Sequence, residues 1–242
     1  MIEVSKFDKI IAANWKLNGS LDFINRYFND FHSKTSFYSN VCGIICPPSI
    51  YLNNFSINHP LFLGAQDCSK FNSGAYTGEI SALMLKESNC QFCIVGHSER
   101  RQIFNQTDED IKLKAENLIN QSINPIICIG ETFEEKKRGS TKDVLKKQIF
   151  NSLPENASIQ SIIIAYEPIW AIGSGLMPTL AEIDSIHSFI KNIKNLEKFK
   201  ILYGGSVKSN NAKNIMDLEN VDGVLVGGAS LDPSEFIKIL NS

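Results

Sequence analysis

The chain has 242 residues and a formal net charge of −2, with 43% hydrophobic and 21% charged residues. This composition is that of a soluble globular protein. The weak net charge gives no reason to expect nucleic acid or an anionic membrane as a main partner. No stretch approaches the roughly 18 to 20 apolar residues of a membrane span, and the first nine residues lack a signal sequence. We therefore expect no membrane partner and a cytoplasmic location.

Six cysteines stand at Cys42, Cys46, Cys68, Cys90, Cys93 and Cys128. Cys90 and Cys93 have the C-x-x-C spacing that occurs in metal and redox sites. No second pair follows at zinc spacing, and Cys93 falls inside a strand-like apolar run. We expect reduced, buried thiols that pack as small hydrophobic side chains, and no metal site.

Short apolar runs alternate with amphipathic segments along the whole chain. In chain order, the predicted strand–helix pairs are 9–13 with 21–34, 41–46 with a short helix near 49–55, 61–65 with 81–88, 92–95 with 107–121, 125–129 with 141–152, 162–166 with 180–195, 201–203 with a helix from about 211, and 223–226 with 234–240. Thr107 and Asp110 open the fourth-pair helix with a capping-box arrangement.

Eight strand–helix pairs without a break in composition predict a (β/α)8 barrel, which is a parallel eight-stranded closed sheet. A doubly wound open sheet also alternates strands and helices. At this length, however, an open sheet would normally have fewer strands or a second domain. No linker, low-complexity segment or charge block interrupts the pattern, so we predict one domain over residues 1–242.

Glu167 directly follows an unbroken apolar run at 162–166. Such a run is typical of a strand that is buried on both faces of a parallel sheet. Desolvation at the end of that strand should raise the pKa of the carboxyl group, which suits a general base working near neutral pH. A single Glu after a strand is more often an ordinary strand terminus, so this residue is a candidate only in combination with others.

The loop 168–175 begins with Pro168 and ends with Gly173 and Gly175. Proline makes the exit from the strand rigid, and the glycines give the far end the freedom that a moving flap needs. Trp170 and Ile172 are large apolar side chains in a loop, where exposure to water is the rule. They need a surface to close against, and a lid over a binding site would provide one.

Further polar residues and glycines follow the ends of other predicted strands. They are Asn14 and Lys16 after the first strand, His97 and Glu99 after the fourth, Ser206 after the seventh, and Gly227 and Gly228 after the eighth. The loops after barrel strands gather at one end, so these residues would meet Glu167 at one mouth. Singly, Lys16 reads as a surface lysine, His97 as a structural histidine, and Glu99 as half of a surface ion pair with Arg100.

His97 precedes an expected helix start at Ser98, where the helix dipole favours a neutral imidazole that can donate a hydrogen bond. Lys16 would hold an anionic substrate and a developing oxyanion. The pairs Gly204-Gly205 and Gly227-Gly228 could be simple tight turns. Together they match the phosphate site that barrels build after strands seven and eight, where bare backbone amides approach the anion.

The chain resembles the triosephosphate isomerase family along its whole length. The matching motifs are ANWKLNG at 13–19, GAYTGEIS at 74–81, GHSERR at 96–101, CIGE at 128–131, AYEPIWAIGSG at 165–175, YGGSV at 203–207 and VGGASL at 226–231. The resemblance implies interconversion of dihydroxyacetone phosphate and D-glyceraldehyde 3-phosphate through an enediol(ate), in glycolysis and gluconeogenesis, with no cofactor and no metal. It also implies the fold predicted above.

The resemblance assigns a role to each candidate residue. Glu167 would move the proton between the two carbons, His97 would polarise the carbonyl, and the 168–175 loop would close as the lid. Asn14 and Lys16 would steady the enediolate, and Glu99 would support them. The phosphate would be gripped by the amides of Gly173, Ser206, Gly227 and Gly228.

The family also implies a homodimer in which the loop 71–79, from Phe71 to Glu79, inserts into the neighbouring subunit. Thr77 would then lie near Asn14 and Lys16 of the partner subunit. The residues alone show only a polar, Gly-containing loop with Tyr76 exposed, which could equally be a plain surface loop.

Four departures from the family pattern stand near the motifs. Leu17 replaces the usual Met, Ser174 replaces the usual Thr of the lid, Asn105-Gln106 replaces the common Gly-Glu, and Leu180 replaces a frequent Pro. The first change conserves volume and the second keeps the hydroxyl. The other two leave the following helix starts less certain.

Two other functions fit a phosphate-gripping barrel. A Schiff-base aldolase would need a lysine at a strand end inside the barrel, whereas Lys9 and Lys200 precede their predicted strands and face the other rim. A non-catalytic binding protein could keep the fold, because fold alone does not fix function. Such a protein would be expected to lose the base or the electrophile, yet Glu167 and His97 are both present.

Overall fold

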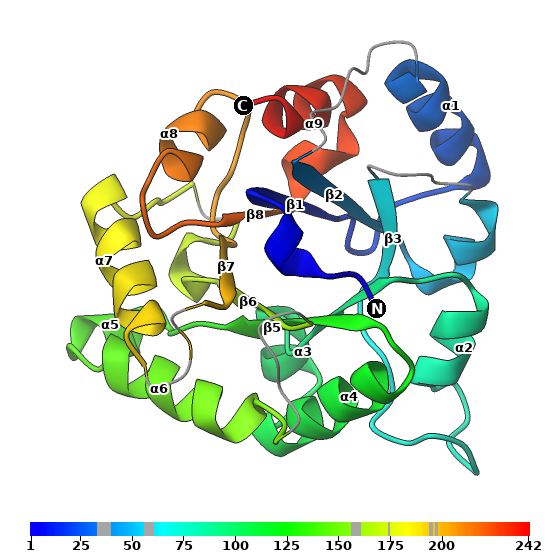
Figure 1. Cartoon of the computed structure of the whole chain (residues 1–242), viewed down its shortest axis with the longest axis horizontal. Helices are drawn as coiled ribbons and strands as arrows, with labels where there is room; N and C mark the ends of the chain where they lie inside the picture. Colours follow the sequence, from blue (N-terminus) through cyan, green and yellow to red (C-terminus); the bar gives the residue numbers. More distant parts are fainter. Residues whose placement is uncertain (33–39, 56–60, 156–160, 174, 194–195, 197) are drawn as a thin grey trace.

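A computed structural model describes residues 1–32, 40–55, 61–155, 161–173, 175–193, 196 and 198–242. Eight strands close into a parallel barrel, in which each strand pairs with the next and β8 pairs with β1 (Figure 1). The strands are β1 (Lys9–Asn14), β2 (Val41–Cys46), β3 (Leu61–Ala65), β4 (Phe92–Val95), β5 (Asn124–Ile129), β6 (Ile163–Tyr166), β7 (Lys200–Tyr203) and β8 (Gly223–Val226). The predicted fold class is confirmed.

Helices surround the barrel as a ring (Figure 1). The α-helices are α1 (Leu21–His32), α2 (Ala82–Glu87), α3 (Ser98–Ile103), α4 (Asp108–Asn120), α5 (Phe133–Lys137), α6 (Thr141–Ser152), α7 (Leu180–Lys191), α8 (Ala212–Met216) and α9 (Pro233–Leu240). Short 3-10 turns are η1 (Val4–Lys6), η2 (Ser49–Asn54), η3 (Ile169–Ala171) and η4 (Gly228–Leu231). Within the described part of the chain, no helix has the length and apolar character to cross a membrane.

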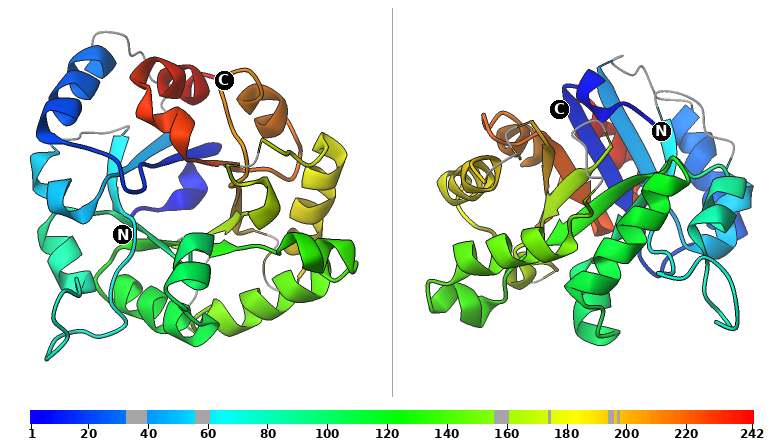
Figure 2. Two further views of the ribbon diagram at one scale, coloured as in Figure 1. Left: turned by 180° about the vertical axis from the view of Figure 1, so that it is seen from behind. Right: turned by 60° about the horizontal axis from the view of Figure 1, so that its bottom comes forward.

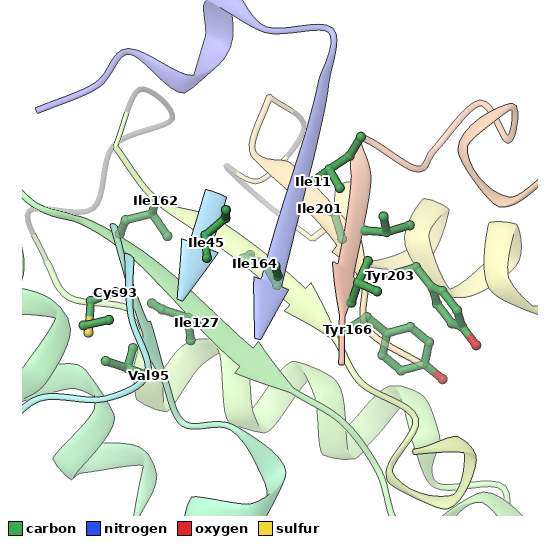
Figure 3. Close-up of a cluster of buried hydrophobic side chains, with 14 of the residues drawn as sticks. Ile11, Ile45, Cys93, Val95, Ile127, Ile162, Ile164, Tyr166, Ile201 and Tyr203 are labelled. Atoms are coloured by element: carbon green, nitrogen blue, oxygen red, sulfur yellow. The ribbon is translucent and has the colours of Figure 1, made fainter. Parts of the chain in front are cut away.

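Two hydrophobic clusters lie on the two faces of the closed sheet. Successive strand residues point to opposite faces, so Ile10 and Ala12 of β1 belong to the barrel interior whereas Ile11 and Ala13 face the helices. The outer cluster is the larger one, and Figure 3 shows part of it, with isoleucines of neighbouring strands side by side. Burial on both faces explains why every strand reads as a nearly continuous apolar run.

The N-terminal segment closes one end of the barrel. Val4 and Phe7 pack into the interior cluster, and Figure 1 shows the η1 turn lying over the centre of the ring. Asn124, the first residue of β5, ties the segment down: its Oδ1 accepts from the backbone N–H of Ile2 at 2.9 Å, and its Nδ2 donates to the Ile2 carbonyl at 2.8 Å. Because the amino ends of the strands are covered, a site inside the barrel must open at their carboxyl ends.

The helix boundaries agree with the sequence signals where a cap defines them. The capping box of Thr107 and Asp110 is present at the start of α4. Thr179 caps α7, so this helix starts at Leu180 although Leu180 replaces a proline. Asn105, one of the four departures from the family pattern, has a φ of 55° between α3 and α4. Asparagine tolerates this left-handed backbone better than other side chains, which accounts for the exchange.

Other helix predictions needed correction. Helix 180–195 ends at residue 191. Helix 21–34 is helical up to residue 32, and its last two predicted residues, 33 and 34, lie outside the described part of the chain, as do residues 194 and 195. Helix α5 was not predicted, because its five residues are too few to show an apolar period. Lys9 and Lys200 are the first residues of β1 and β7 rather than preceding them, although they remain at the amino ends.

All six cysteines are free and buried, as the sequence predicts. Burial raises the pKa of the Cys90 thiol to about 12, which leaves it protonated at neutral pH. The C-x-x-C spacing therefore reflects the packing of an apolar strand and the turn before it.

His187 is a fully buried histidine on α7. Its burial should make the stability of the fold fall at acidic pH. Its ring lies against Tyr166 and Tyr203, with centroids 5.9 Å and 6.4 Å away, and burial lowers its pKa to about 3. An unfolded histidine titrates near 6.5. Above that pH the ring is neutral in both the folded and the unfolded state, so stability does not depend on its protonation. As the pH falls from 6.5 toward 3, only the unfolded histidine takes up a proton, and stability is lost. Between pH 7 and pH 5 the contribution is about 2 kcal/mol.

Urea unfolding of the wild type and of His187→Phe at pH 7 and pH 5 measures this contribution. The wild type should lose about 2 kcal/mol more than the variant between the two pH values. Equal losses in both proteins would show that this ring does not titrate on unfolding.

Candidate active site

One cavity of about 500 Å³ opens at the carboxyl ends of the strands. Its lining includes Asn14, Lys16, His97, Glu167, Gly173, Ser206, Gly227 and Gly228. Residues from five separate loops of the chain therefore meet in one place, at the end of the barrel where the sequence predicts them. Glu99 is the one candidate that does not line this cavity, and it stands behind Lys16 instead.

Glu167 and His97 face each other inside this cavity. The carboxylate Oε1 lies 3.2 Å from His97 Nε2, and Oε2 accepts from the backbone N–H of Ser98 at 3.2 Å. Both side chains are nearly inaccessible to solvent, at 2% and 6% exposure. A base that abstracts a proton needs a free oxygen, so the carboxylate must give up one of these contacts when a substrate enters.

The hydrogen bonds around His97 define which ring nitrogen carries the proton. His97 caps α3, and its Nδ1 accepts from the backbone N–H of Glu99 at 3.2 Å. A nitrogen that accepts a hydrogen bond carries no proton, so the neutral ring holds its proton on Nε2. That N–H points into the cavity toward Glu167, where it can donate to a substrate oxygen. The helix-terminus argument from the sequence agrees with this geometry.

Lys16 reaches the cavity from a strained backbone. Its φ is 53°, in the left-handed region, which is costly for a residue with a side chain and is found mainly at functional sites. Three contacts hold it there: its N–H donates to Asn14 Oδ1 at 3.0 Å, Gln66 Nε2 donates to its carbonyl at 2.9 Å, and its Nζ donates to Glu99 Oε1 at 2.5 Å. No local sequence signal indicates the role of Gln66, which directly follows β3.

Glycines form the far wall of the cavity. A Cβ placed on Gly173 or Gly228 would meet no atom within 4 Å, so open space lies in front of both backbones. A Cβ on Gly227 would lie 3.5 Å from Lys16 Cε, which brings the lysine chain beside this wall. Bare backbone next to a cation is the arrangement that binds a small anion such as phosphate.

The two apolar side chains of the 168–175 loop point in different directions. Ile172 lines the cavity, as expected for a lid. Trp170 does not: its Nε1 donates to Glu131 Oε1 at 2.9 Å, and Lys136 Nζ lies 3.7 Å from its ring centroid. The expectation that both close over the binding site is therefore wrong for Trp170. Its indole N–H needs an acceptor when it is partly buried, and Glu131 offers one on the outer side.

The loop is held to the cavity rim by a second contact. Ser206 Oγ donates to the Ala171 carbonyl at 2.7 Å. Gly173 and Gly175 have φ values of 66° and 77°, which only glycine adopts without strain. Both positions therefore need a residue without a side chain, and the Ser174 between them lies outside the described residues.

Two further glycines, Gly130 and Gly204, fix the position of Glu167. A Cβ on Gly130 would lie 1.8 Å from the Glu167 carbonyl oxygen, and a Cβ on Gly204 would lie 2.8 Å from Glu167 Cγ. The strand ends on both sides are therefore packed against this residue. Glycine in a strand-end motif was the available signal for such a close approach.

Replacing Gly204 by Ala should displace the Glu167 side chain without removing any catalytic group. The added methyl falls inside van der Waals distance of Cγ, so the side chain must move by a few tenths of an ångström or more. Because a misplacement of about 1 Å can cost ~10²-fold in rate, we expect kcat to fall about 10-fold to 100-fold. Steady-state kinetics with a thermal unfolding curve measure this, and an unchanged kcat would show that Glu167 tolerates the shift.

Known proteins of one family match this chain in sequence and in fold. A model of the family described as triosephosphate isomerase matches residues 9–242. The chain belongs to the triosephosphate isomerase family. A triosephosphate isomerase of Rhizobium meliloti is 42% identical over 242 residues, which is 95% of this chain and 94% of the relative. One from Francisella tularensis subsp. mediasiatica is 40% identical over 244 residues, which is 96% of each chain.

A solved structure of a triosephosphate isomerase shares the barrel. The crystal structure of triosephosphate isomerase from Bartonella henselae has a TM-score of 0.86 to this chain, with 34% identity over 97% of this chain and 98% of that one. The family resemblance stated from the motifs is therefore confirmed over almost the full length.

Proposed function

We propose that this chain interconverts dihydroxyacetone phosphate and D-glyceraldehyde 3-phosphate, using the residues of the cavity in the roles below. The observation that carries the proposal is the meeting of Glu167 with the N–H side of His97, beside a cation and a wall of bare backbone amides. A proton next to a carbonyl is weakly acidic, so a base needs an electrophile that spreads the resulting charge. The cavity contains both.

Proton transfer runs between the two reacting carbons of the substrate. Glu167 removes a proton from one carbon while His97 Nε2–H donates to the carbonyl oxygen, which gives an enediol(ate). Glu167 returns the proton to the neighbouring carbon, and His97 exchanges protons with the two oxygens. The buried setting keeps these groups out of competition with water.

Lys16 stabilises the negative charge that develops on the substrate oxygen and offsets part of the phosphate charge. Asn14 holds the lysine backbone and faces the same cavity. Glu99 is a positioning residue, because it pairs with Lys16 Nζ and its amide fixes the His97 tautomer without lining the cavity.

The phosphate is assigned to the glycine wall, where the amides of Gly173, Ser206, Gly227 and Gly228 would grip it. The 168–175 loop would close over it, since Ile172 lines the cavity from that loop. Exclusion of water matters here because an enediol phosphate that is exposed and mobile can lose its phosphate.

A homodimer through the loop 71–79 belongs to the same proposal, together with a single domain over residues 1–242 and a cytoplasmic location. The loop projects from the barrel (Figures 1 and 2), and the rings of Phe71 and Tyr76 stack at 3.7 Å. Large apolar side chains after the first four strands are exposed, namely Leu17, Ile50, Tyr76, Leu83, Met84, Ile103 and Phe104. Such exposed apolar groups favour an interface.

Light scattering should give twice the chain mass of 27.0 kDa for the wild type and the single mass for Tyr76→Asp. A monomeric wild type would contradict the dimer.

A Schiff-base aldolase is disfavoured by the lysines at the strand starts. Lys9 Nζ donates to the carbonyls of Met216 and Val221, both at 2.6 Å, so it is engaged at the amino end of the barrel. Lys200 Nζ lies 3.7 Å from Asp222 at the same end. Neither reaches the cavity.

Coupling the protein to an indicator reaction that consumes glyceraldehyde 3-phosphate tests the activity directly. We expect isomerisation of dihydroxyacetone phosphate without any added cofactor or metal. Absence of turnover by a folded protein in this assay would overturn the proposed function.

A further inference from the structure

A second cavity lies on the outer side of the 168–175 loop. It has a volume of about 360 Å³ and lies between α5, α7 and the end of β6, which are neighbours in Figure 1. None of its lining residues lines the substrate cavity. Its size falls within the range of small-molecule sites.

The cavity is lined by apolar side chains, by the hydroxyl residues Thr141 and Ser185, and by three charged groups. Tyr166, Trp170, Pro178 and Ile186 supply the apolar surface, and the carboxylates of Glu131 and Glu182 are the acidic groups, accompanied by Lys136. An aromatic and aliphatic pocket with two carboxylates and one ammonium group favours a ligand with an apolar body and a positive charge.

Glu131 is buried, and only one of its two carboxylate oxygens accepts hydrogen bonds. Only 1% of the residue is exposed. Its Oε1 accepts from Trp170 Nε1 at 2.9 Å and from the Tyr166 hydroxyl at 3.3 Å, whereas its Oε2 has no hydrogen-bond partner among the described residues. Burial raises the pKa of this carboxyl group. A buried carboxylate oxygen without a donor is costly, and a cationic donor offsets that cost.

Lys136 does not fill this position. Its Nζ lies over the Trp170 ring and pairs with Glu182 Oε1 at 3.2 Å. Among the described residues, no ion pair within 4.0 Å joins Lys136 to Glu131. The lysine shows that the indole face accepts a cation, while the inner oxygen of Glu131 lacks one.

We propose that this cavity is a binding site for a small organic monocation, an ammonium or amidinium group on an aromatic or short aliphatic body. The charged end donates to Glu131 Oε2, and the apolar body packs against Tyr166, Trp170 and Ile186. Oε1 then remains the acceptor of the Trp170 indole, so the bound cation stabilises the base of the loop in its present position. Cation binding therefore disfavours movement of the loop, and movement of the loop weakens cation binding to the same extent.

The probe is benzylammonium chloride, titrated calorimetrically into the full chain near neutral pH, with benzyl alcohol as the neutral analogue. We expect saturable binding of one cation per chain and at least 10-fold weaker binding of the alcohol. Glu131→Gln keeps an acceptor for Trp170 and removes the charge, and should weaken the cation at least 10-fold. Glu134→Gln, the same change at an exposed position in the first turn of α5, is the matched control and should leave affinity within twofold.

A second variant keeps the test independent of the folding of the first. Ala181→Leu fills the mouth of the cavity without touching Glu131 and should abolish binding. The chain has two tryptophans, and the Trp170 indole N–H resonance should shift on titration while that of Trp15 does not. No saturable binding, equal affinity for the alcohol, unchanged affinity in Glu131→Gln or Ala181→Leu, or a shift confined to Trp15 would each overturn the site.

The effect on turnover rests on the proposed function and is measured separately. Saturating benzylammonium should lower kcat of the wild type at least twofold and leave kcat of Ala181→Leu unchanged. Binding with an unaltered kcat would overturn the coupling to the loop. A chain that binds the cation but does not isomerise triose phosphate would refute the proposed function and leave the site standing.

Discussion

Shortening Glu167 to aspartate should lower kcat about 10²-fold, because the carboxylate would be withdrawn by about 1 Å from the carbon it must reach. The residue has no freedom to compensate. Its backbone N–H donates to the Ile129 carbonyl at 2.7 Å, and Gly130 and Gly204 pack against it so closely that neither has room for a Cβ. KM should change little, since the phosphate is assigned to other residues. Steady-state kinetics in the coupled assay give both constants.

Glu219→Asp is the matched control for this variant, because Glu219 is an exposed glutamate far from the cavity lining. It makes the same chemical change and should leave kcat within about twofold, as surface substitutions do. Full activity of Glu167→Asp, or an equal loss in both variants, would remove Glu167 from the role of base.

Replacing Lys16 by methionine should lower kcat/KM about 10²-fold to 10³-fold, the range that the loss of one preorganised charge-stabilising group produces. Methionine matches most of the length of the side chain and removes the ammonium group. The loss should appear in KM as well as in kcat, because Lys16 lies beside the Gly227 wall as well as the reacting groups. Glu99 would lose its partner in this variant, but its side chain is 44% exposed and can be hydrated.

Lys208→Met is the matched control, since Lys208 is an exposed lysine at the rim of the same cavity. It separates a specific role of Lys16 from a general effect of positive charge near the mouth. The control should change kcat/KM by less than about threefold at physiological ionic strength, because exposed charges are strongly screened. Equal losses in the two variants would contradict a specific role for Lys16.

The barrel could be predicted from the sequence because its strands are buried on both faces. Runs such as 41–46 and 223–226 contain only apolar residues and glycine, so their observed boundaries match the prediction. Helix ends were less accurate. Where a capping box was present, as at Thr107, the start was right, whereas helix 180–195 had no stop signal and ends earlier than predicted.

The site was predictable to the extent that it depends on which strand end a residue follows. Topology alone brings Lys16, His97 and Glu167 to one cavity. Side-chain direction was not predictable, because the partner of Trp170, Glu131, lies 39 positions away in the chain. The left-handed backbone of Lys16 also left no local signal, since its carbonyl is held by Gln66 from the loop after β3.

Isomerisation of dihydroxyacetone phosphate in deuterium oxide, followed by proton NMR, tests the central claim most directly. A carboxylate that carries the proton exchanges it with solvent, so a substantial fraction of the glyceraldehyde 3-phosphate formed should carry deuterium at C2, and Glu167→Gln should form almost none of this product. Product formed without any deuterium, or equal deuterium incorporation by Glu167→Gln, would contradict proton transfer by Glu167 through an enediol.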